Sequence, residues 1–430
     1  MNGLERGDLP PEIVTPPPGP RSRALAARLA RAEAPGINTL GPGDLPTVVW
    51  REALGANVLD VDGNRFVDLT SGFGVAAVGH RHPRVVAAVG AQAARLLHGL
   101  ADAAAHPARL ELAERLAALA PVDDARVHFA VSGADAVEIA LKTAVAATGR
   151  ARVLAFEPAY HGVSLGALAA SSRPEFRAPF AAHLHAHVTR LAFGADPAAV
   201  DRALAAAPFA AVLVEPVVGR EGVLVPPAGW LAAVAAAARR HGALLVADEI
   251  FTGFGRTGRW FAVERDGVRP DLLCCGKALG GGLPIGAVLG TCRAMEVWRA
   301  GGEALHTGTF VAHPLACAAA LATLDVLADE QLVTRAAALG LRLGEALARA
   351  AAGACAVRGV GALWGLEFAS AAAARQAAAA ARAAGVLVLA GGAAGRVVQV
   401  APPLVIAELQ LERALAVLAA ACAAPAQRPG

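Results

Sequence analysis

The sequence predicts an α/β protein with a large domain around a mostly parallel sheet and a smaller α+β domain from both chain ends. Between residues 75 and 320, short apolar runs alternate with helical stretches, which is typical of a parallel sheet covered on both faces. Residues 48–69 alternate apolar and polar side chains across an Asp-Gly turn, which indicates a small antiparallel sheet. After residue 320, long helical stretches precede further strand-like segments.

In chain order, a proline-rich arm at residues 1–36 carries a short helix from Arg21 to Glu33. Central strands are expected at 127–131, 152–156, 210–214, 243–247 and 286–289. Central helices are expected at 107–119, 134–147, 197–207 and 228–240. One or two long helices follow at 315–351, and strands follow at 357–368 and onward to 405. We therefore expect an N-terminal arm with part of the small domain at 1–75, the large domain at 76–320, and the rest of the small domain at 321–430.

Composition excludes several classes of protein. The 430 residues carry 39 basic and 36 acidic side chains, too balanced to infer a nucleic-acid-binding face. No apolar run approaches the ~18–20 residues that a membrane span requires, so no membrane partner is expected. The acidic, proline-containing start is unlike a secretory signal. The six cysteines include no C-x-x-C pair, so buried thiols in a reducing cytoplasm are expected.

Lysine is scarce in this chain. Only Lys142 and Lys277 are lysines among 39 basic residues, and Tyr160 is the single tyrosine. A lysine amine can lose its proton and attack a carbonyl, whereas guanidinium stays charged. Lys142 lies over two turns into a predicted helix, where a solvated position is expected. Lys277 follows the apolar strand of PDLLCCGKALGGG, and burial there would lower its pKa and make it a nucleophile.

Three other segments bear polar or aromatic groups next to strand ends. In ALLVADEIFTGFGRTG, Asp248 and Glu249 end a buried strand, where ligands bind in parallel sheets. A carboxylate there could keep a pyridine nitrogen protonated, and no metal site is predicted because histidines are not nearby. Ser132 and its following glycine could hold a phosphate at a helix N-terminus, or Ser132 could simply cap that helix. Tyr160 could stack on a planar cofactor, or it could be a half-buried loop residue.

These four segments, in this order, resemble the class III aminotransferases, a group of fold-type-I pyridoxal-phosphate enzymes that includes ornithine and 4-aminobutyrate transaminases. The resemblance runs from IVTPPPGPRSRAL through DVDGNRFVDLTSGFGVAAVGHRHPRVV to APPLVI, and it is most specific in DEI, GFGRTG and GKALGGGLP. It implies a seven-stranded sheet, the cofactor pyridoxal 5'-phosphate, and amino transfer from an amino acid or amine to an oxo acid or aldehyde. The cofactor would pass through its pyridoxamine form.

The resemblance also implies a role for individual residues. Gly133 and Ala134 would donate backbone N–H groups to the cofactor phosphate. Tyr160 would stack on the pyridine ring, with Ile250 on the opposite face, and Asp248 would pair with the ring nitrogen.

Catalysis and assembly follow from four further positions. Lys277 would bind the cofactor covalently and then move a proton between the substrate α-carbon and the cofactor. Glu215 and His161 would support the site. Thr309 would reach the cofactor phosphate of a neighbouring subunit, so the resemblance implies a homodimer.

Four departures from the family pattern concern function. Val218 stands where a glutamine usually bonds the cofactor ring oxygen. Val163 and Gln399 replace two arginines that hold substrate carboxylates, and a neutral amide cannot replace a bidentate guanidinium. Residues 312–314 read Ala-His-Pro instead of Gly-Asn-Pro. A plain 4-aminobutyrate:2-oxoglutarate enzyme is therefore not expected.

Candidate substrate-binding residues follow from these departures. Arg220 stands where related enzymes carry a glutamate, and it could bind a carboxylate or be an ordinary surface-loop arginine. Arg396 is a second candidate. Trp50 and Phe73 are expected to line the pocket together with Gln399.

Other functions stay open beside transamination. A racemase or epimerase that inverts the α-carbon of an amino acid would use the same scaffold. A cofactor-binding protein with degraded catalysis would explain Val218 and the altered segment at 312–314. A purely structural role would leave the purified protein without cofactor colour.

Overall fold

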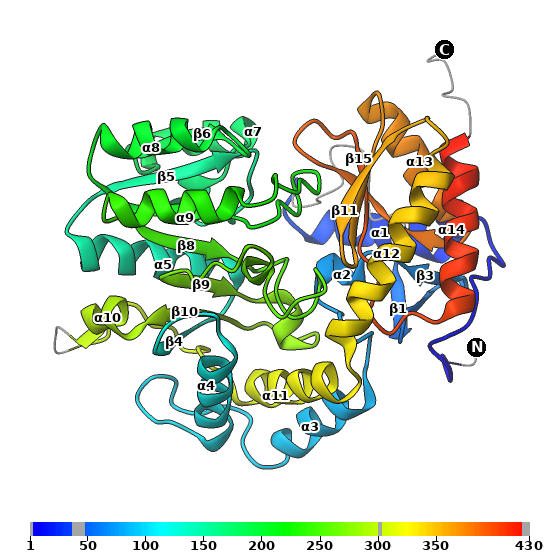
Figure 1. Cartoon of the computed structure of the whole chain (residues 1–430). Helices are drawn as coiled ribbons and strands as arrows, with labels where there is room; N and C mark the ends of the chain where they lie inside the picture. Colours follow the sequence, from blue (N-terminus) through cyan, green and yellow to red (C-terminus); the bar gives the residue numbers. More distant parts are fainter. Residues whose placement is uncertain (1–2, 37–47, 300–302, 424–430) are drawn as a thin grey trace.

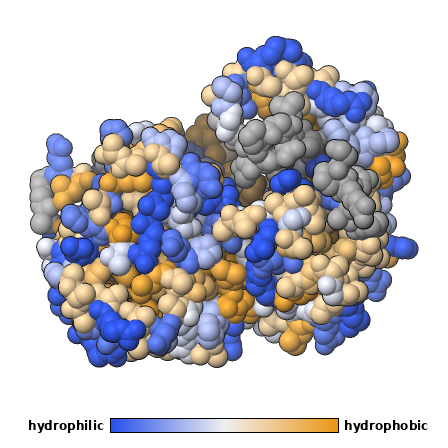
Figure 2. All heavy atoms as spheres, turned by 90° about the horizontal axis from the view of Figure 1, so that it is seen from above, coloured by the Kyte–Doolittle hydropathy of each residue, from blue (hydrophilic) through white to orange (hydrophobic). Residues whose placement is uncertain are grey.

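The computed structural model describes residues 3–36, 48–299 and 303–423. Figure 1 shows one half built on a large sheet and a second half that contains both N-terminal and C-terminal elements. The predicted fold class is confirmed. In the space-filling view, moderately hydrophobic residues (pale orange) lie among hydrophilic ones (blue) across the visible face (Figure 2). This mixture is expected for an alanine-rich chain.

The large sheet has seven strands in the order β4-β10-β9-β8-β7-β5-β6. Their bounds are β4 Ala125–Ala130, β5 Arg152–Glu157, β6 Val188–Ala192, β7 Phe209–Val214, β8 Leu244–Asp248, β9 Leu272–Cys275 and β10 Gly286–Thr291. Strands β6, β5, β7, β8 and β9 run parallel, whereas β10 is antiparallel to both β4 and β9. The apolar run at 286–289 is therefore the antiparallel member of a mostly parallel sheet.

Helices cover this sheet because each strand-to-strand crossover in a parallel sheet needs a long connection. Their bounds are α3 Pro83–Ala93, α4 Pro107–Leu119, α5 Gly133–Thr148, α6 Leu165–Ala170, α7 Pro174–Arg177, α8 Pro197–Ala205, α9 Trp230–Arg240, α10 Cys292–Met295 and α11 Pro314–Asp329. Short 3-10 turns occur at Ala178–His183, Ala262–Asp266, Lys277–Gly280 and Glu296–Arg299. The buried strand β7 is apolar throughout, as expected for a strand covered on both faces.

The second half joins the two ends of the chain. Strands β1 Trp50–Leu54, β2 Asn57–Asp60 and β3 Arg65–Asp68 form an antiparallel sheet, which β13 Val386–Leu387 extends by pairing parallel to β3. A separate sheet contains β11 Ala356–Val360, β12 Leu363–Glu367, β14 Leu389–Gly391 and β15 Val397–Val400. The helices of this second half are α1 Pro20–Ala32, α2 Ser71–Gly74, α12 Leu332–Ala351, α13 Ala371–Ala383 and α14 Glu408–Ala423. The division into domains at residues 75 and 320 stays a prediction.

Several details refine the sequence predictions. The stretch 315–351 forms two helices, α11 and α12, separated at Glu330 and Gln331. The edge strand β6 was not predicted, because its residues are only half-buried and lack an apolar run. All six cysteines are free, but Cys292 and Cys355 are half-buried, so the expectation of buried thiols is wrong for these two. No helix in the described part of the chain is long and apolar enough to cross a membrane.

Candidate active site

The four chemistry-bearing segments meet at one edge of the large sheet. Asp248 is the last residue of β8, and Lys277 lies two residues beyond the end of β9. Tyr160 follows β5, and Glu215 directly follows β7. Because these parallel strands are neighbours, their carboxyl ends bring residues that are far apart in sequence into one site.

Asp248 and His161 form a buried pair. Asp248 Oδ2 lies 2.7 Å from His161 Nδ1, and Asp248 Oδ1 accepts the Ile250 N–H at 3.1 Å. Asp248 is 4 % exposed and His161 is 2 % exposed. Burial opposes the charged imidazole, but the Asp248 hydrogen bond and the nearby Asp248 and Glu215 charges raise the His161 pKa above its usual value. The Oδ2 atom of Asp248 therefore has a buried imidazole as its partner.

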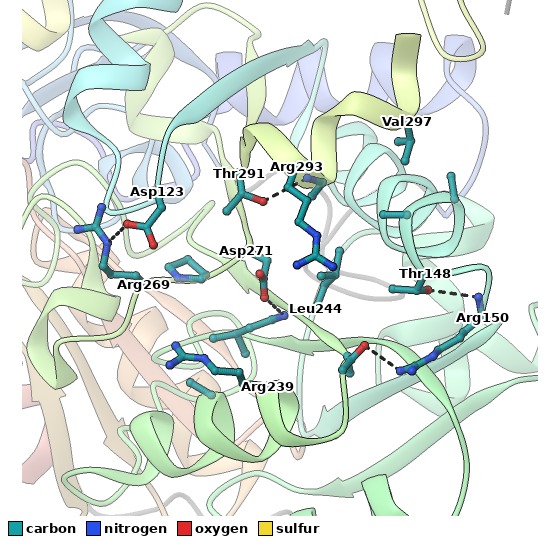
Figure 3. A pocket seen from close by; sticks show the side chains of 18 residues that line it. Asp123, Thr148, Arg150, Arg239, Leu244, Arg269, Asp271, Thr291, Arg293 and Val297 are labelled. Carbon is teal, nitrogen blue, oxygen red and sulfur yellow. Dashed lines mark hydrogen bonds and ion pairs between the residues drawn. The ribbon is translucent and has the colours of Figure 1, made fainter. Parts of the chain in front are cut away.

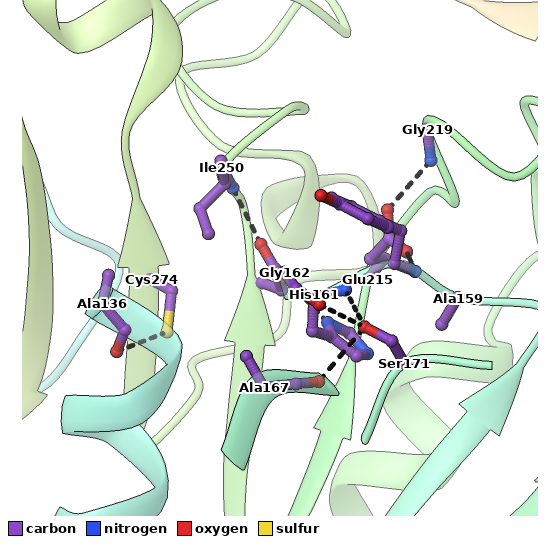
Figure 4. A network of polar contacts seen from close by, with 12 residues as sticks. Ala136, Ala159, His161, Gly162, Ala167, Ser171, Glu215, Gly219, Ile250 and Cys274 are labelled. Atoms are coloured by element: carbon purple, nitrogen blue, oxygen red, sulfur yellow. Dashed lines mark hydrogen bonds and ion pairs between the residues drawn. The ribbon is translucent and has the colours of Figure 1, made fainter. Parts of the chain in front are cut away.

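Glu215 links two segments of the site. One carboxylate oxygen accepts the Tyr160 N–H at 2.9 Å, and the other accepts the Gly219 N–H at 3.0 Å. Figure 4 shows Glu215 and Gly219 beside the His161 network, in which the His161 N–H donates to Ser171 Oγ. Burial raises the pKa of Glu215 to about 7. Glu215 thus fixes the distance between the Tyr160 segment and the loop that begins at Gly219.

Lys277 is the nucleophile candidate at the centre of this edge. It is half-buried, and its Nζ lies 4.1 Å from the centroid of the Phe251 ring. Burial lowers its pKa to about 8, so a larger share of the amine is neutral near physiological pH than in an ordinary lysine. Its backbone φ of +42° is in the left-handed region, which is uncommon for a residue with a side chain. A strained lysine at a strand end is consistent with a functional position.

The N-terminus of α5 offers donors to an anion. Ser132 Oγ accepts the Asp135 N–H at 3.2 Å, so Ser132 is the helix cap. The N–H groups of Gly133 and Ala134 have no acceptor among residues 3–36, 48–299 and 303–423. A Cβ on Gly133 would lie 2.9 Å from Ile250 Cγ2, so only glycine allows this close approach. Free donors at a helix start fit a phosphate group.

The residues expected to bind substrate are Trp50, Phe73, Arg220 and Gln399. The Arg220 guanidinium lies over the Tyr160 ring at 4.1 Å from its centroid. Gln399 Nε2 lies 3.5 Å from the Gly219 carbonyl oxygen, and Phe73 is exposed with a φ of +61°. Trp50 is exposed and packs edge-on against a histidine ring. These residues come from four separate parts of the chain.

Other predicted positions differ in their surroundings. Arg396 forms an ion pair with Glu367 at 2.7 Å, so its guanidinium already has a carboxylate partner. Thr309 and Val163 are exposed. Val218 is fully buried, and its backbone N–H and carbonyl both pair with Leu224 at 3.0 Å.

Three residues of the motif that follows β8 make contacts that the sequence did not predict. Phe251 contacts Lys277 as described above. Glu249 is fully buried and accepts the Val263 N–H at 2.8 Å, and burial raises its pKa to about 7. Arg256 is 1 % exposed and donates to the Pro402 carbonyl at 2.6 Å, which ties the large sheet to the C-terminal part. The sequence placed Glu249 beside Asp248 at the strand end, but it indicated no role for Phe251 or Arg256, although both lie in the same motif.

A cavity of about 730 Å³ lies at the opposite end of the strands. Its lining includes Leu244, the first residue of β8, and Asp271 just before β9 (Figure 3). Arg150 there donates to the carbonyl oxygens of Phe209 and Gly242 at 3.1 and 2.8 Å. This cavity is separate from the site around Lys277, since Asp248 is at the far end of β8.

The strand ends of the parallel sheet bring together a buried acid, a tyrosine and a lysine of lowered pKa, which is typical of an enzyme in which a lysine amine reacts with a carbonyl group. The chain belongs to the class-III aminotransferases, since the family model described as aminotransferase class-III matches residues 41–422. Members of this family depend on pyridoxal 5'-phosphate, so the chain is a pyridoxal-phosphate-dependent transaminase.

Individual relatives agree with this family. The chain is 45 % identical to acetylornithine aminotransferase of Mycobacterium tuberculosis, over 93 % of this chain and 97 % of that protein. It is 40 % identical to putrescine aminotransferase of Pectobacterium atrosepticum, over 87 % and 82 %. The solved ornithine aminotransferase of Toxoplasma gondii has a TM-score of 0.85 and 32 % identity, with 92 % of each chain covered. An amine transaminase from an uncultivated Pseudomonas species, solved in its pyridoxal-phosphate-bound form, has a TM-score of 0.83 and 32 % identity, over 91 % and 99 %.

Proposed function

We propose that this transaminase removes a primary amino group from the end of a short aliphatic chain and passes it to an oxo acid or aldehyde. The observation that carries the proposal is the half-buried Lys277 amine of lowered pKa, held at the same sheet edge as the buried Asp248–His161 pair. Acetylornithine, ornithine and putrescine, named for the relatives, all carry a primary amine on such a chain. This shared group supports the choice of donor.

We further propose which residues hold the cofactor. The free N–H groups of Gly133 and Ala134, together with the capped turn at Ser132, would bind its phosphate. Tyr160 and Ile250 would lie against its ring. Asp248, oriented by His161, would pair with the ring nitrogen.

The bound cofactor supplies an electron sink that stabilises negative charge on the substrate carbon. The protein groups then have separate tasks. Lys277 is neutral above a pKa of about 8, so its amine can take a proton from a carbon atom and return it at a neighbouring one. Asp248, hydrogen-bonded to His161, would face the cofactor's ring nitrogen and stabilise positive charge there. Glu215 keeps Tyr160 and Gly219 in place through two hydrogen bonds.

We propose a homodimer in which Thr309 reaches the cofactor phosphate of the partner subunit. Thr309 is exposed, and Leu305 and Phe310 beside it are 65 % and 63 % exposed. Exposed apolar side chains grouped on one segment are typical of an interaction surface. The enzyme is also proposed to work in the cytoplasm, because none of its six cysteines forms a disulfide.

The test is a half-reaction without acceptor. The purified protein is loaded with pyridoxal 5'-phosphate, and acetylornithine, ornithine and putrescine are added singly while the cofactor absorbance is recorded. A stable change to the pyridoxamine spectrum, absent in Lys277→Ala, would support amino transfer and identify the donor. Recovery of the starting spectrum while an amino acid loses optical purity would favour the racemase alternative and overturn the proposal.

A further inference from the structure

The loop that carries Arg220 is fixed from both sides. Val218 and Leu224 pair through two backbone hydrogen bonds of 3.0 Å, which close the loop at its base. Arg358 Nε donates to the Gly222 carbonyl at 2.9 Å, from a strand of the C-terminal sheet. Glu221 is 3 % exposed. A loop held by this many contacts presents the Arg220 side chain from a defined position.

Arg220 forms no ion pair with a carboxylate in the described part of the chain. Three other arginines near the loop already have carboxylate partners. Arg173 pairs with Glu221 at 2.8 Å, and both Arg358 and Arg396 pair with Glu367. Arg220 instead lies over the Tyr160 ring at 4.1 Å from its centroid. A half-buried cation that rests only on aromatic rings has all its N–H donors available to an anion.

This guanidinium lies close to the reactive lysine. Gly219, next to Arg220, packs so tightly on Phe251 that a Cβ there would lie 3.0 Å from Phe251 Cγ. The same Phe251 ring contacts the Lys277 Nζ at 4.1 Å. The positive charge of Arg220 also contributes to the lowered pKa of Lys277, after the larger effect of burial. The loop that carries Arg220 and the Lys277 amine thus both contact the Phe251 ring.

We infer that Arg220 binds the carboxylate of the substrate, so that the enzyme prefers donors with a primary amine at one end and a carboxylate at the other. This inference rests on the transaminase activity proposed above and specifies its substrate class. Gln399 and Val163, which stand where related enzymes have arginines, offer no positive charge. The second candidate, Arg396, already pairs with Glu367 at 2.7 Å. A planar guanidinium with parallel N–H donors matches a carboxylate in two hydrogen bonds.

The experiment compares two donors that differ only in the carboxylate, 5-aminopentanoate and 1-aminopentane. The wild-type enzyme is expected to have a kcat/KM at least about 30-fold higher for 5-aminopentanoate, since charge-assisted hydrogen bonds are among the strongest in proteins. Arg220→Met should reduce this preference by about tenfold or more, mainly through KM for 5-aminopentanoate. Arg220→Lys should be intermediate, because its ammonium keeps the charge but not the paired donors.

Controls separate a binding role from general damage. Arg202→Met removes an exposed arginine of α8 and should leave the preference unchanged. Cofactor absorbance should be equal in wild type and Arg220→Met. The dissociation constant of glutarate, which has no amine or carbonyl to react, is measured by calorimetry and should rise about tenfold in Arg220→Met.

Each outcome decides between the proposals. Equal losses for both donors in Arg220→Met, or an unchanged preference together with unchanged glutarate binding, would overturn the role of Arg220. A wild-type enzyme that takes an amino group from neither donor, nor from the relatives' substrates, would instead contradict the proposed function. Glutarate binding would still test Arg220 in that case, because it needs no turnover.

Discussion

The two sides of the active site differ in burial and in the number of partners that each ionisable group has. We call the first the cofactor side; its members are the residues proposed to act on the cofactor, His161, Glu215, Asp248 and Lys277. We call the second the substrate side; its members are the residues proposed to bind substrate, Trp50, Phe73, Arg220 and Gln399. On the cofactor side, the three groups other than Lys277 are at most 5 % exposed. On the substrate side, Trp50 and Phe73 are 43 % and 46 % exposed, and Arg220 lacks an ion pair among the described residues.

The difference in burial corresponds to different tasks for the two sides. Groups that act on the cofactor must be held in place before it reacts, because their electrostatic effect depends on fixed positions in a dry environment. The Asp248–His161 contact of 2.7 Å and the two hydrogen bonds to Glu215 provide such positions. Groups that receive a substrate must instead keep donors open to it. Mutations on the two sides should therefore have different kinetic signatures.

The largest effect should come from Lys277→Ala. Alanine removes both the amine that attaches the cofactor and the group that moves the proton, so amino transfer should fall by at least about 10³-fold. The measurement is kcat with saturating cofactor, together with the absorbance of the protein-bound cofactor. Lys142→Ala is the matched control, since Lys142 is exposed and is the only other lysine. Comparable activity in the two variants would remove Lys277 from the mechanism.

Asp248→Asn should have the next largest effect. The asparagine has nearly the same shape but no charge, so the buried His161 and the bound cofactor both lose their anion. We expect kcat to fall by about 10²-fold, the size of losing one preorganised electrostatic contact. Glu249→Gln provides the comparison, because Glu249 is equally buried but bonds to Thr252 and Val263 instead. If both variants lost activity to the same extent, general damage to the strand end would explain the result.

The sequence indicated the cofactor-side residues more directly than the substrate-side residues. Asp248 and Lys277 were recognisable because each follows an apolar strand, and the carboxyl ends of parallel strands meet at one edge. Arg220 was ambiguous, because its stacking on Tyr160 depends on how Glu215 holds two loops together. The role of Arg256 was invisible, since its acceptors include Ala362 and Pro402, over 100 residues away in sequence. Long-range contacts of loops leave little trace in local patterns.

The pH dependence of cofactor attachment tests the environment of Lys277 directly. Burial disfavours the ammonium form and lowers the pKa to about 8, so the amine is mostly protonated below pH 8 and mostly neutral above it. The rate at which the cofactor-free protein binds pyridoxal 5'-phosphate should rise about tenfold between pH 7 and pH 9 and then level off. N-α-acetyl-lysine, measured in the same buffers, should show a rate that still rises above pH 9. A protein rate that follows the free amine would mean that Lys277 is not desolvated.

The smallest effect should come from adding a charge to the substrate side with Gln399→Arg. Gln399 Nε2 lies 3.5 Å from the Gly219 carbonyl, next to Arg220, so a guanidinium at position 399 would face the same space. A second cation should favour an acceptor with two carboxylates, and we expect KM for 2-oxoglutarate to fall about fivefold while KM for pyruvate changes little. Gln399→Met is the neutral control and should show no such gain. A higher KM for both acceptors in Gln399→Arg would mean that repulsion between the two guanidinium groups outweighs the added contact.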